Sequence, residues 1–272
     1  KKPKILVLSG GSMRGIAIVG VLQGLEELEL LSEVKTYAGT SIGAFISMLL
    51  VLGYKPSEMF EFIKKFKFEK LKKLEPVYLF TSFGADKGER VEFMIKNLIK
   101  KKMGRDNITL SELFKLTNKK LIVTSTCLNE DKICYFSHLN EPDLPVHLAV
   151  RMSMCIPLMY MPIFYKGHYY LDGGCKDNYP IGIFRKKLKN VLGVCLCQKA
   201  TTTNNIFEFE DFITRLLFCI INNSVRDVEL YKNHSIVVNI TNVGIFDFNM
   251  SLEKKIELFN TGYKSALEHF QK

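Results

Sequence analysis

Short apolar runs that end in small, turn-forming residues alternate with longer apolar stretches at the start of the chain. Residues 5–8 are too few for a helix and lead into a Ser-Gly-Gly-Ser turn, whereas residues 16–31 have the length and residue types of a helix. The same order follows at once, with a strand predicted at 34–38 and an apolar helix at 42–52. Two such units in succession predict a parallel sheet with helices on both faces.

The pattern after residue 55 predicts further helices and strands. Residues 56–104 carry lysine and phenylalanine at helical spacing, with breaks at 81–84 and 87–88, and predict amphipathic helices around a mobile loop. Beyond them the sequence predicts strands at 121–128, 132–137, 191–197 and 235–240, a hairpin at 163–171, and helices at 146–154, 206–232 and 251–270.

No internal repeat and no strong boundary divides the sequence, and residues 200–205 form its one low-complexity linker. We therefore expect one domain over residues 1–272. Within it, segment 56–104 is a candidate helical cap over the site, and 206–272 is a helical C-terminal segment.

Composition places the chain in the globular class. It has 272 residues, of which 47% are hydrophobic, enough for one large core or two modest ones. The apolar run 44–52 is about half the roughly 20 residues that cross a bilayer, so we expect a soluble protein, at most peripheral to membranes. The chain opens with Lys1, Lys2 and Pro3 and shows no secretory signal; the missing initiator methionine indicates trimming, and an earlier leader stays open.

The seven cysteines form neither a Cys-x-x-Cys pair nor a cluster with histidine; they are Cys127, Cys134, Cys155, Cys175, Cys195, Cys197 and Cys219. Three of them, Cys127, Cys195 and Cys197, lie in apolar strand-like stretches. We therefore expect buried free thiols in a reducing, cytoplasmic compartment. This spacing disfavours zinc, and we expect no metal and no cofactor.

The formal net charge of +10 is concentrated in three clusters: residues 64–73, residues 100–102 with Arg105, and residues 185–187 with Lys189. Basic faces attract polyanions, so nucleic acid and an anionic membrane surface are both candidates, beside solvated helix faces. Because no nucleic-acid-binding motif is present, we expect no nucleic acid partner.

Residues 39–43 read Gly-Thr-Ser-Ile-Gly between the predicted second strand and its helix. A G-x-S-x-G pentapeptide at a strand-to-helix turn is typical of a nucleophilic serine, because the flanking glycines permit the crowded turn that exposes the hydroxyl. The five residues alone also fit an ordinary connection. Ser41 is thus a candidate nucleophile that needs a base and oxyanion donors elsewhere.

Candidate donors lie in the first glycine turn, whose amides point outward at a helix N-terminus. They are Gly10, Gly11 and Ser12, and Arg14 adds a positive charge. The turn lacks both G-x-G-x-x-G spacing and a G-K-[ST] ending, which disfavours a nucleotide site.

No histidine has a convincing setting for the base. The five are His138, His147, His168, His234 and His269, in positions typical of surface or half-buried residues. The alternative is Asp172, which ends a predicted strand before two glycines, although aspartate before glycine is also a common turn residue.

Taken together, these motifs resemble the patatin-like phospholipases, which combine a glycine-rich loop with arginine, a G-x-S-x-G serine and a D-G-G or D-G-A aspartate in this order. Here they are residues 9–15, 39–43 and 172–174. The resemblance continues in Arg-Met-Ser-Met-Cys-Ile-Pro at 151–157 and Asn-Tyr-Pro at 178–180, and is clear over residues 4–197. It implies a three-layer α/β/α fold with a mainly parallel central sheet.

The resemblance implies a lipid acyl hydrolase with a Ser-Asp dyad and no metal. Ser41 would attack the acyl ester of a glycerophospholipid or related lipid, and Asp172 would accept its proton. A free aspartate with a pKa near 4 is a weak base at neutral pH, so burial must raise this pKa, or position and oxyanion stabilisation must dominate. Gly10, Gly11 and Ser12 would form the oxyanion hole, with Arg14 holding the loop or the developing charge. Calcium independence follows, since no EF-hand loop is present.

Because the substrate lies in a bilayer, the enzyme must touch membrane, and residues 60–68 offer cations with aromatic rings or, alternatively, core side chains. One residue departs from the family pattern: Ser12 replaces its third consecutive glycine. If that position needs a positive φ, the side chain adds about 1 kcal/mol of strain.

The alternatives are another acyl chemistry on the same dyad, such as lipase, thioesterase or transacylase action, and a catalytically impaired lipid-binding homologue. Acyl-chain, headgroup and positional preference, oligomeric state and any activating partner stay open.

Overall fold

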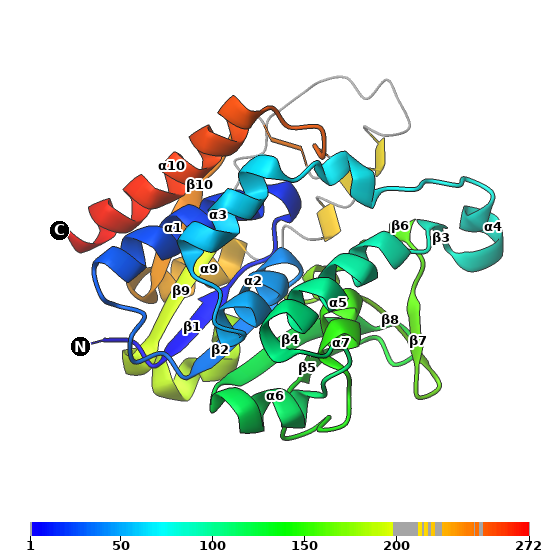
Figure 1. Cartoon of the computed structure of the whole chain (residues 1–272), viewed down its shortest axis with the longest axis horizontal. Coiled ribbons are helices and arrows are strands. Elements are labelled where there is room, and N and C mark those ends of the chain that lie inside the picture. The colour runs from blue at the N-terminus through cyan, green and yellow to red at the C-terminus, as the bar shows by residue number, and fades with distance from the viewer. Residues whose placement is uncertain are drawn as a thin grey trace.

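The structure is a computed structural model that describes residues 2–197, 225–241 and 247–271, together with residues 212, 213, 215, 216, 219, 220, 243 and 244. Within these residues the main sheet has eight strands in the order β10-β9-β1-β2-β4-β8-β7, with β5 also paired to β4 (Figure 1). They are β1 (Ile5–Leu8), β2 (Thr36–Thr40), β4 (Lys120–Cys127), β5 (Lys132–Phe136), β7 (Ile163–Tyr165), β8 (His168–Asp172), β9 (Val191–Cys197) and β10 (Ser235–Asn239).

The five strands from β10 to β4 are all parallel, whereas β5, β8 and β7 join antiparallel. The mainly parallel α/β sheet predicted from the sequence is therefore confirmed. A second small sheet pairs β3 (Gly84–Asp86) with β6 (Leu158–Tyr160). The sequence analysis did not predict either of these short strands.

Helices cover both faces of the sheet, as the figure shows. The α-helices are α1 (Gly15–Glu27), α2 (Ile42–Val51), α3 (Pro56–Lys65), α4 (Tyr78–Ser82), α5 (Glu89–Met103), α6 (Leu110–Thr117), α7 (Val146–Ser153), α9 (Val225–Tyr231) and α10 (Leu252–Phe270). Short 3-10 helices are η1 (Ser12–Arg14), η2 (Phe68–Leu71), η3 (Gly173–Cys175), η4 (Pro180–Asn190) and η6 (Lys232–His234).

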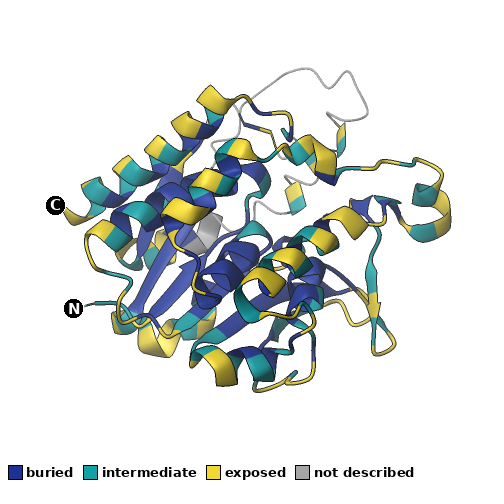
Figure 2. Cartoon of the chain, in the orientation of Figure 1, coloured by how far each residue is buried: buried dark blue, intermediate teal, exposed yellow. Residues whose placement is uncertain are grey.

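Strand β1 shows why two apolar layers form. All four of its residues are buried, and because successive side chains point to opposite faces, they divide between two cores. Leu6 and Leu8 join the larger core with helices α1 and α2, whereas Ile5 and Val7 join a smaller one with η4 and α9. Figure 2 shows this buried sheet between more exposed helices.

The C-terminal helix α10 packs along α1. A side chain on Gly20 would meet the backbone of Phe259, and one on Gly262 would meet the backbone of Ala17, so the two helices approach closely only because both positions are glycine. The sequence correctly predicts α10 and β10. The predicted linker 200–205 and residues 206–211 and 221–224 of the predicted helix lie outside the described residues.

Segment 56–104 contains helices α3, η2, α4 and α5, as predicted, together with β3. Other details also differ from the sequence-based expectation: α1 ends at Glu27 instead of residue 31, β2 lies at Thr36–Thr40 instead of 34–38, and neither α6 nor η4 was predicted. In the part of the chain that the structure describes, no helix is both long and apolar enough to span a membrane.

Candidate active site

Strand β4 brings the two candidate catalytic residues together. Its residue Thr124 pairs with Thr40 at the end of β2, and the next residue, Ser125, pairs with Asp172 at the end of β8. Strand β5 pairs with residues 123–127 of β4 along the opposite edge of β4. Strands β2 and β8 therefore pair with the same edge of β4, and their carboxyl ends meet there. Ser41 and Asp172, 131 residues apart in sequence, therefore become neighbours.

Ser41 stands at a sharp turn between β2 and α2. Its backbone has φ 54° and ψ −121°, a strained conformation that costs about 1–3 kcal/mol and occurs at functional sites. Gly43 permits the turn, because a side chain there would collide with the backbone of Leu8 and Ser9. The amide of Ser41 donates to Ser153 Oγ at 2.8 Å, which holds the turn from α7.

The Ser41 hydroxyl donates a hydrogen bond to Asp172 Oδ2 at 2.6 Å. The other carboxylate oxygen, Oδ1, accepts from the Gly174 amide at 2.8 Å. Both side chains are buried, with 7% of Ser41 and 2% of Asp172 exposed. Burial raises the pKa of Asp172 from 3.8 to about 6, although the hydrogen bonds from Ser41 and Gly174 oppose this shift. The carboxylate is thus a stronger base than a free aspartate.

The glycine turn lies against Ser41, since a side chain on Gly10 would come within 3.4 Å of the Ser41 Cβ. The Gly10 amide, predicted as an oxyanion donor, instead donates to the carbonyl of Asn178 at 2.9 Å. For Gly10 this is a correction: its amide is already used to fix the loop. Gly11 and Ser12 stay the predicted donors.

Ser12 has φ 50°, the left-handed conformation that favours glycine. The position does require a positive φ, so the Ser12 side chain adds the expected strain of about 1 kcal/mol. Arg14 is buried and donates through Nε to the Gly11 carbonyl at 3.1 Å. Burial lowers its pKa to about 10, against the opposing effect of Cys197 and Cys195, so it stays charged at neutral pH. Arg14 thus fixes the loop, one of the two roles predicted for it.

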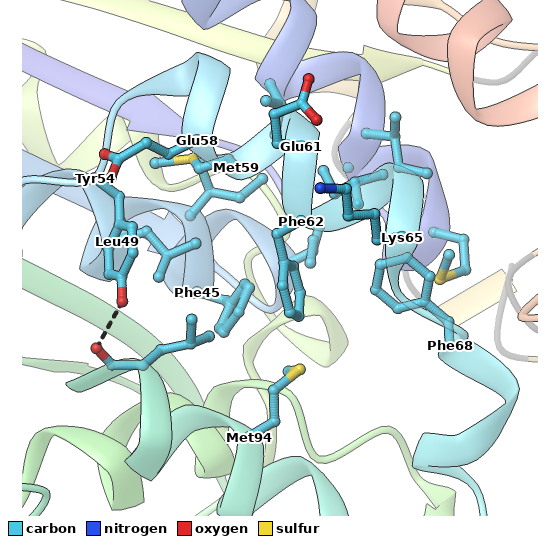
Figure 3. Close-up of a pocket in the computed structure, with 18 of the residues that line it drawn as sticks. Phe45, Leu49, Tyr54, Glu58, Met59, Glu61, Phe62, Lys65, Phe68 and Met94 are labelled. Atoms are coloured by element: carbon cyan, nitrogen blue, oxygen red, sulfur yellow. Dashed lines mark hydrogen bonds between the residues drawn. The ribbon is translucent and has the colours of Figure 1, made fainter. Parts of the chain in front are cut away.

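An apolar cavity of about 450 Å³ is lined at one end by Ser12, Gly15 and Ile42, of which Ile42 directly follows Ser41. It continues between α2, α3 and α5 along Phe45, Leu49, Met59, Phe62 and Met94 (Figure 3). Charged residues Glu58, Glu61, Lys65 and Lys101 also line it. The mainly apolar lining suits a hydrocarbon chain.

No role was predicted from the sequence for Ser153 or Asn178, and the cavity itself was not predicted, although Ser12 and the rings of Phe62 and Phe68, which line it, had been given other roles. Ser153 and Asn178 do lie in the two segments, 151–157 and 178–180, that resemble the family. The signal was therefore present, but nothing in the sequence showed which neighbours they contact.

The histidines lie in other settings. Neither Ser41 nor Asp172 has a histidine partner among the residues that the structure describes. His138 stacks on Phe114 with ring centroids 3.8 Å apart, and His147 is buried 3.6 Å from Glu92. The described part of the chain also has no group of three or more histidine, cysteine, aspartate and glutamate side chains that could hold a metal.

The predicted buried thiols are found in part. Cys127, Cys155 and Cys195 are buried, whereas three others are half-buried and Cys219 is exposed. None of the seven cysteines, all of which lie within the described residues, forms a disulfide bond.

Comparison with known proteins gives a family and a fold. The model of a family described as patatin-like phospholipase matches residues 6–185. The chain is 29% identical over 283 residues to an uncharacterized protein of Acanthamoeba polyphaga mimivirus, covering 99% of this chain and 94% of that protein. It is 34% identical over 188 residues to a probable lipid hydrolase of Invertebrate iridescent virus 6, covering 66% of this chain and 62% of that protein.

Among solved structures, VipD from Legionella pneumophila has the same fold, with a TM-score of 0.64 and 16% sequence identity. The similarity covers all of this chain and 67% of VipD.

Proposed function

Because the chain belongs to the patatin-like phospholipase family, we propose that it is a calcium-independent lipid acyl hydrolase of the phospholipase A type, with Ser41 as nucleophile and Asp172 as base. The observation that carries the proposal is the 2.6 Å hydrogen bond between the Ser41 hydroxyl and Asp172. The name of the viral relative, a probable lipid hydrolase, supports the same class of substrate.

In the proposed first step, Ser41 Oγ attacks the ester carbonyl while its proton passes to Asp172 Oδ2. Collapse of the tetrahedral intermediate expels the alcohol, which takes that proton and leaves an acyl group on Ser41. A water molecule then gives a proton to Asp172 and attacks the acyl group, and Ser41 recovers the proton as the fatty acid leaves. The raised pKa of Asp172 suits both directions of transfer.

The oxyanion would be stabilised by the amides of Gly11 and Ser12, on a loop that Arg14 and Asn178 hold. Each such donor contributes about 3 kcal/mol to lowering the barrier. The scheme assigns no step to calcium, so a chelator is expected to leave the rate unchanged. The acyl chain would lie in the cavity beside Ile42.

The test is fatty-acid release from phosphatidylcholine vesicles by wild type, Ser41→Ala and Asp172→Asn. Ser47→Ala is a matched control, because Ser47 is a buried serine on α2 whose hydroxyl donates to the Ala38 carbonyl and does not contact Ser41 or Asp172. We expect release to fall at least a hundredfold in the first two variants and to persist in the control. Undiminished fatty-acid release from Ser41→Ala and Asp172→Asn would contradict the proposed catalytic dyad.

Two observations support a second candidate, a catalytically impaired lipid-binding homologue: Ser12 is strained, and the amide of Gly10 in the same loop is occupied. A fluorophosphonate probe separates the two, since it labels Ser41 only if the serine is activated. Lipase, thioesterase or transacylase action on the same dyad is distinguished by the products.

We further propose that residues 1–272 form one patatin-like domain that acts in the cytoplasm on the surface of membranes. In the described residues, α10 and β10 complete the core begun by β1, which supports a single unit. Limited proteolysis followed by calorimetry tests this, with one cooperative transition as the expected result.

A further inference from the structure

Helix α4 and the residues at its two ends carry large apolar side chains that are mostly exposed. None of its residues is buried. Phe80 is 89% exposed, and the flanking Val77 and Phe83 are 62% and 59% exposed. Folding gains nothing from large apolar groups in water, so such a cluster indicates an interaction surface.

The hairpin of β7 and β8 extends this cluster. The ring of Phe83 packs edge-on against Tyr169 with centroids 6.3 Å apart, and Phe164 lies 5.0 Å from Tyr169. Phe164 is 61% exposed. Figure 1 shows α4 and β7 at the same end of the molecule, and Figure 2 shows both in the intermediate and exposed colours, with neither buried. We call Val77, Phe80, Phe83, Phe164 and Tyr169 the aromatic tip.

The aromatic tip lies outward from the catalytic pair. Strand β8 continues beyond the carboxyl end of β2, with Asp172 nearest to Ser41 and Tyr169 three residues farther out. At about 3.4 Å per residue, Tyr169 is about 10 Å from Asp172 along the strand. A lipid surface on the tip would therefore lie close to the reacting serine.

The base of α4 is fixed by hydrogen bonds to its neighbours. The Lys73 amide donates to Asp86 Oδ2 at 2.5 Å, and the Glu75 amide donates to the Ala85 carbonyl at 2.7 Å. Arg90 donates to the carbonyls of Lys70 and Lys72 at 3.0 Å. These contacts hold the α4 part of the tip in one conformation, so little conformational entropy is lost when it binds.

Charge around the α4 part of the tip favours an anionic surface. Residues 70–90 contain five cations, Lys70, Lys72, Lys73, Lys87 and Arg90, and three carboxylates, of which Asp86 is buried. Near an anionic membrane each lysine or arginine can contribute about 1 kcal/mol. Aromatic rings with lysines beside them are the composition of membrane-interface segments.

The lysine- and phenylalanine-rich segment 60–68, predicted from the sequence to touch lipid, uses its rings in packing. Phe60 stacks on Phe259 of α10 with centroids 3.8 Å apart. Phe62 and Phe68 line the cavity. These rings are half-buried, whereas the aromatic tip offers more exposed apolar groups for a membrane contact.

We infer that the aromatic tip inserts into the interface of an anionic phospholipid bilayer and places the catalytic pair over its substrate. This rests on the proposed function for the identity of the substrate, but membrane insertion can be measured without catalysis. A protein partner is the competing occupant, and it predicts no response to protein-free vesicles.

The chain contains no tryptophan, so one introduced at the tip is the sole reporter. The test uses Phe80→Trp in a Ser41→Ala background, so that the vesicles stay intact. The matched control is Leu116→Trp in the same background. Leu116 is 60% exposed on α6, close to Lys120 at the opposite end of β4.

With phosphatidylcholine vesicles that contain phosphatidylglycerol, we expect a blue shift of the Phe80→Trp emission and quenching by acyl-chain-brominated lipid. The Leu116→Trp control should show neither. No response at residue 80, or an equal response from both variants, would overturn the inference.

A second pair of variants measures binding in the Ser41→Ala background. Phe80→Ser combined with Phe83→Ser should lower the vesicle-bound fraction about tenfold or more, and Leu116→Ser should leave it unchanged. With Ser41 restored, the double variant should hydrolyse a soluble short-chain ester at the wild-type rate. Unchanged vesicle binding in the double variant would overturn the inference that the aromatic tip inserts into the membrane. If wild type binds vesicles but hydrolyses no ester, only the proposed function is contradicted.

Discussion

The Ser153 hydroxyl accepts a hydrogen bond from the backbone amide of Ser41 at 2.8 Å, across 112 residues of sequence. Ser153 is fully buried at the end of α7, and Ser41 has a backbone conformation that few residues adopt. The contact satisfies an amide that the turn leaves without a helical partner. It makes Ser153 a positioning residue for Ser41, the proposed nucleophile.

Ser153→Ala should leave the Ser41 amide buried and unsatisfied, at a cost of about 1–3 kcal/mol in unfolding free energy. Because the strained turn loses its support, we expect kcat on a soluble ester to fall about tenfold or more with little change in KM. Urea unfolding and steady-state kinetics measure the two effects. Ser153→Thr keeps the hydroxyl and should recover part of kcat; equal kcat in wild type and Ser153→Ala would contradict this role.

The raised pKa of Asp172 predicts the pH dependence of the rate. The base must be ionised, so kcat/KM should rise with pH through about 6 and level off above it. A soluble ester assayed between about pH 5 and about pH 8 gives the profile without interference from lipid ionisation. A profile that is flat across that range would contradict Asp172 as the titrating base.

The same shift predicts an effect on stability. The folded state binds the Asp172 proton more tightly than the unfolded state, so its contribution to stability is present below pH 3.8 and is lost as pH rises through about 6. Two pKa units correspond to about 3 kcal/mol. Asp172→Asn should therefore unfold at higher urea than wild type at neutral pH, with the difference shrinking near pH 4. If Asp172→Asn is less stable than wild type at neutral pH, the prediction that ionised Asp172 destabilises the folded state is contradicted.

Ser12 tests whether strain in the oxyanion loop limits the reaction. Ser12→Gly removes the side chain at φ 50°, but glycine also raises the entropy of the unfolded chain, so we expect little net change in stability. If the loop with Ser12 already stabilises the oxyanion, kcat changes less than about threefold. The loss of one oxyanion donor would change kcat by a factor of about 100 or more. A rise of tenfold or more would show that the natural serine impairs catalysis.

The cavity predicts selectivity for long acyl chains. Met94→Trp places a larger side chain on its wall, whereas Met103→Trp, on the same helix, serves as control because Met103 does not line the cavity. We expect kcat/KM for a long-chain ester to fall about tenfold in Met94→Trp, with little change for a butyrate ester. Equal losses on both esters would place the acyl chain elsewhere.

The sequence predicted those parts of the fold that local pattern determines. Strands β1 and β9 are apolar runs bounded by turns, and Ser41 and Asp172 each lie in a motif with a recognisable order. Helix α6 was missed although Thr109 and Glu112 form a capping box, because its eight residues are short and half-polar.

The missing parts depend on contacts between distant segments. Nothing near Gly10 in the sequence shows that its amide donates to the carbonyl of Asn178. The rings at 60–68 could face lipid or core on the sequence alone. For Phe60, its packing on Phe259 shows that the ring is used inside the protein. Residues of α2, α3 and α5 likewise enclose the cavity only once these helices pack together.

The central claim is that acyl transfer passes through Ser41 with Asp172 as base. Acid quench in the first turnovers of a long-chain p-nitrophenyl ester, followed by peptide mass mapping, tests it directly. The account predicts an acyl group on Ser41 that forms at least a hundredfold more slowly in Asp172→Asn and is absent from Ser41→Ala. Ester hydrolysis at the wild-type rate in Ser41→Ala, or an acyl group on a different residue, would contradict it.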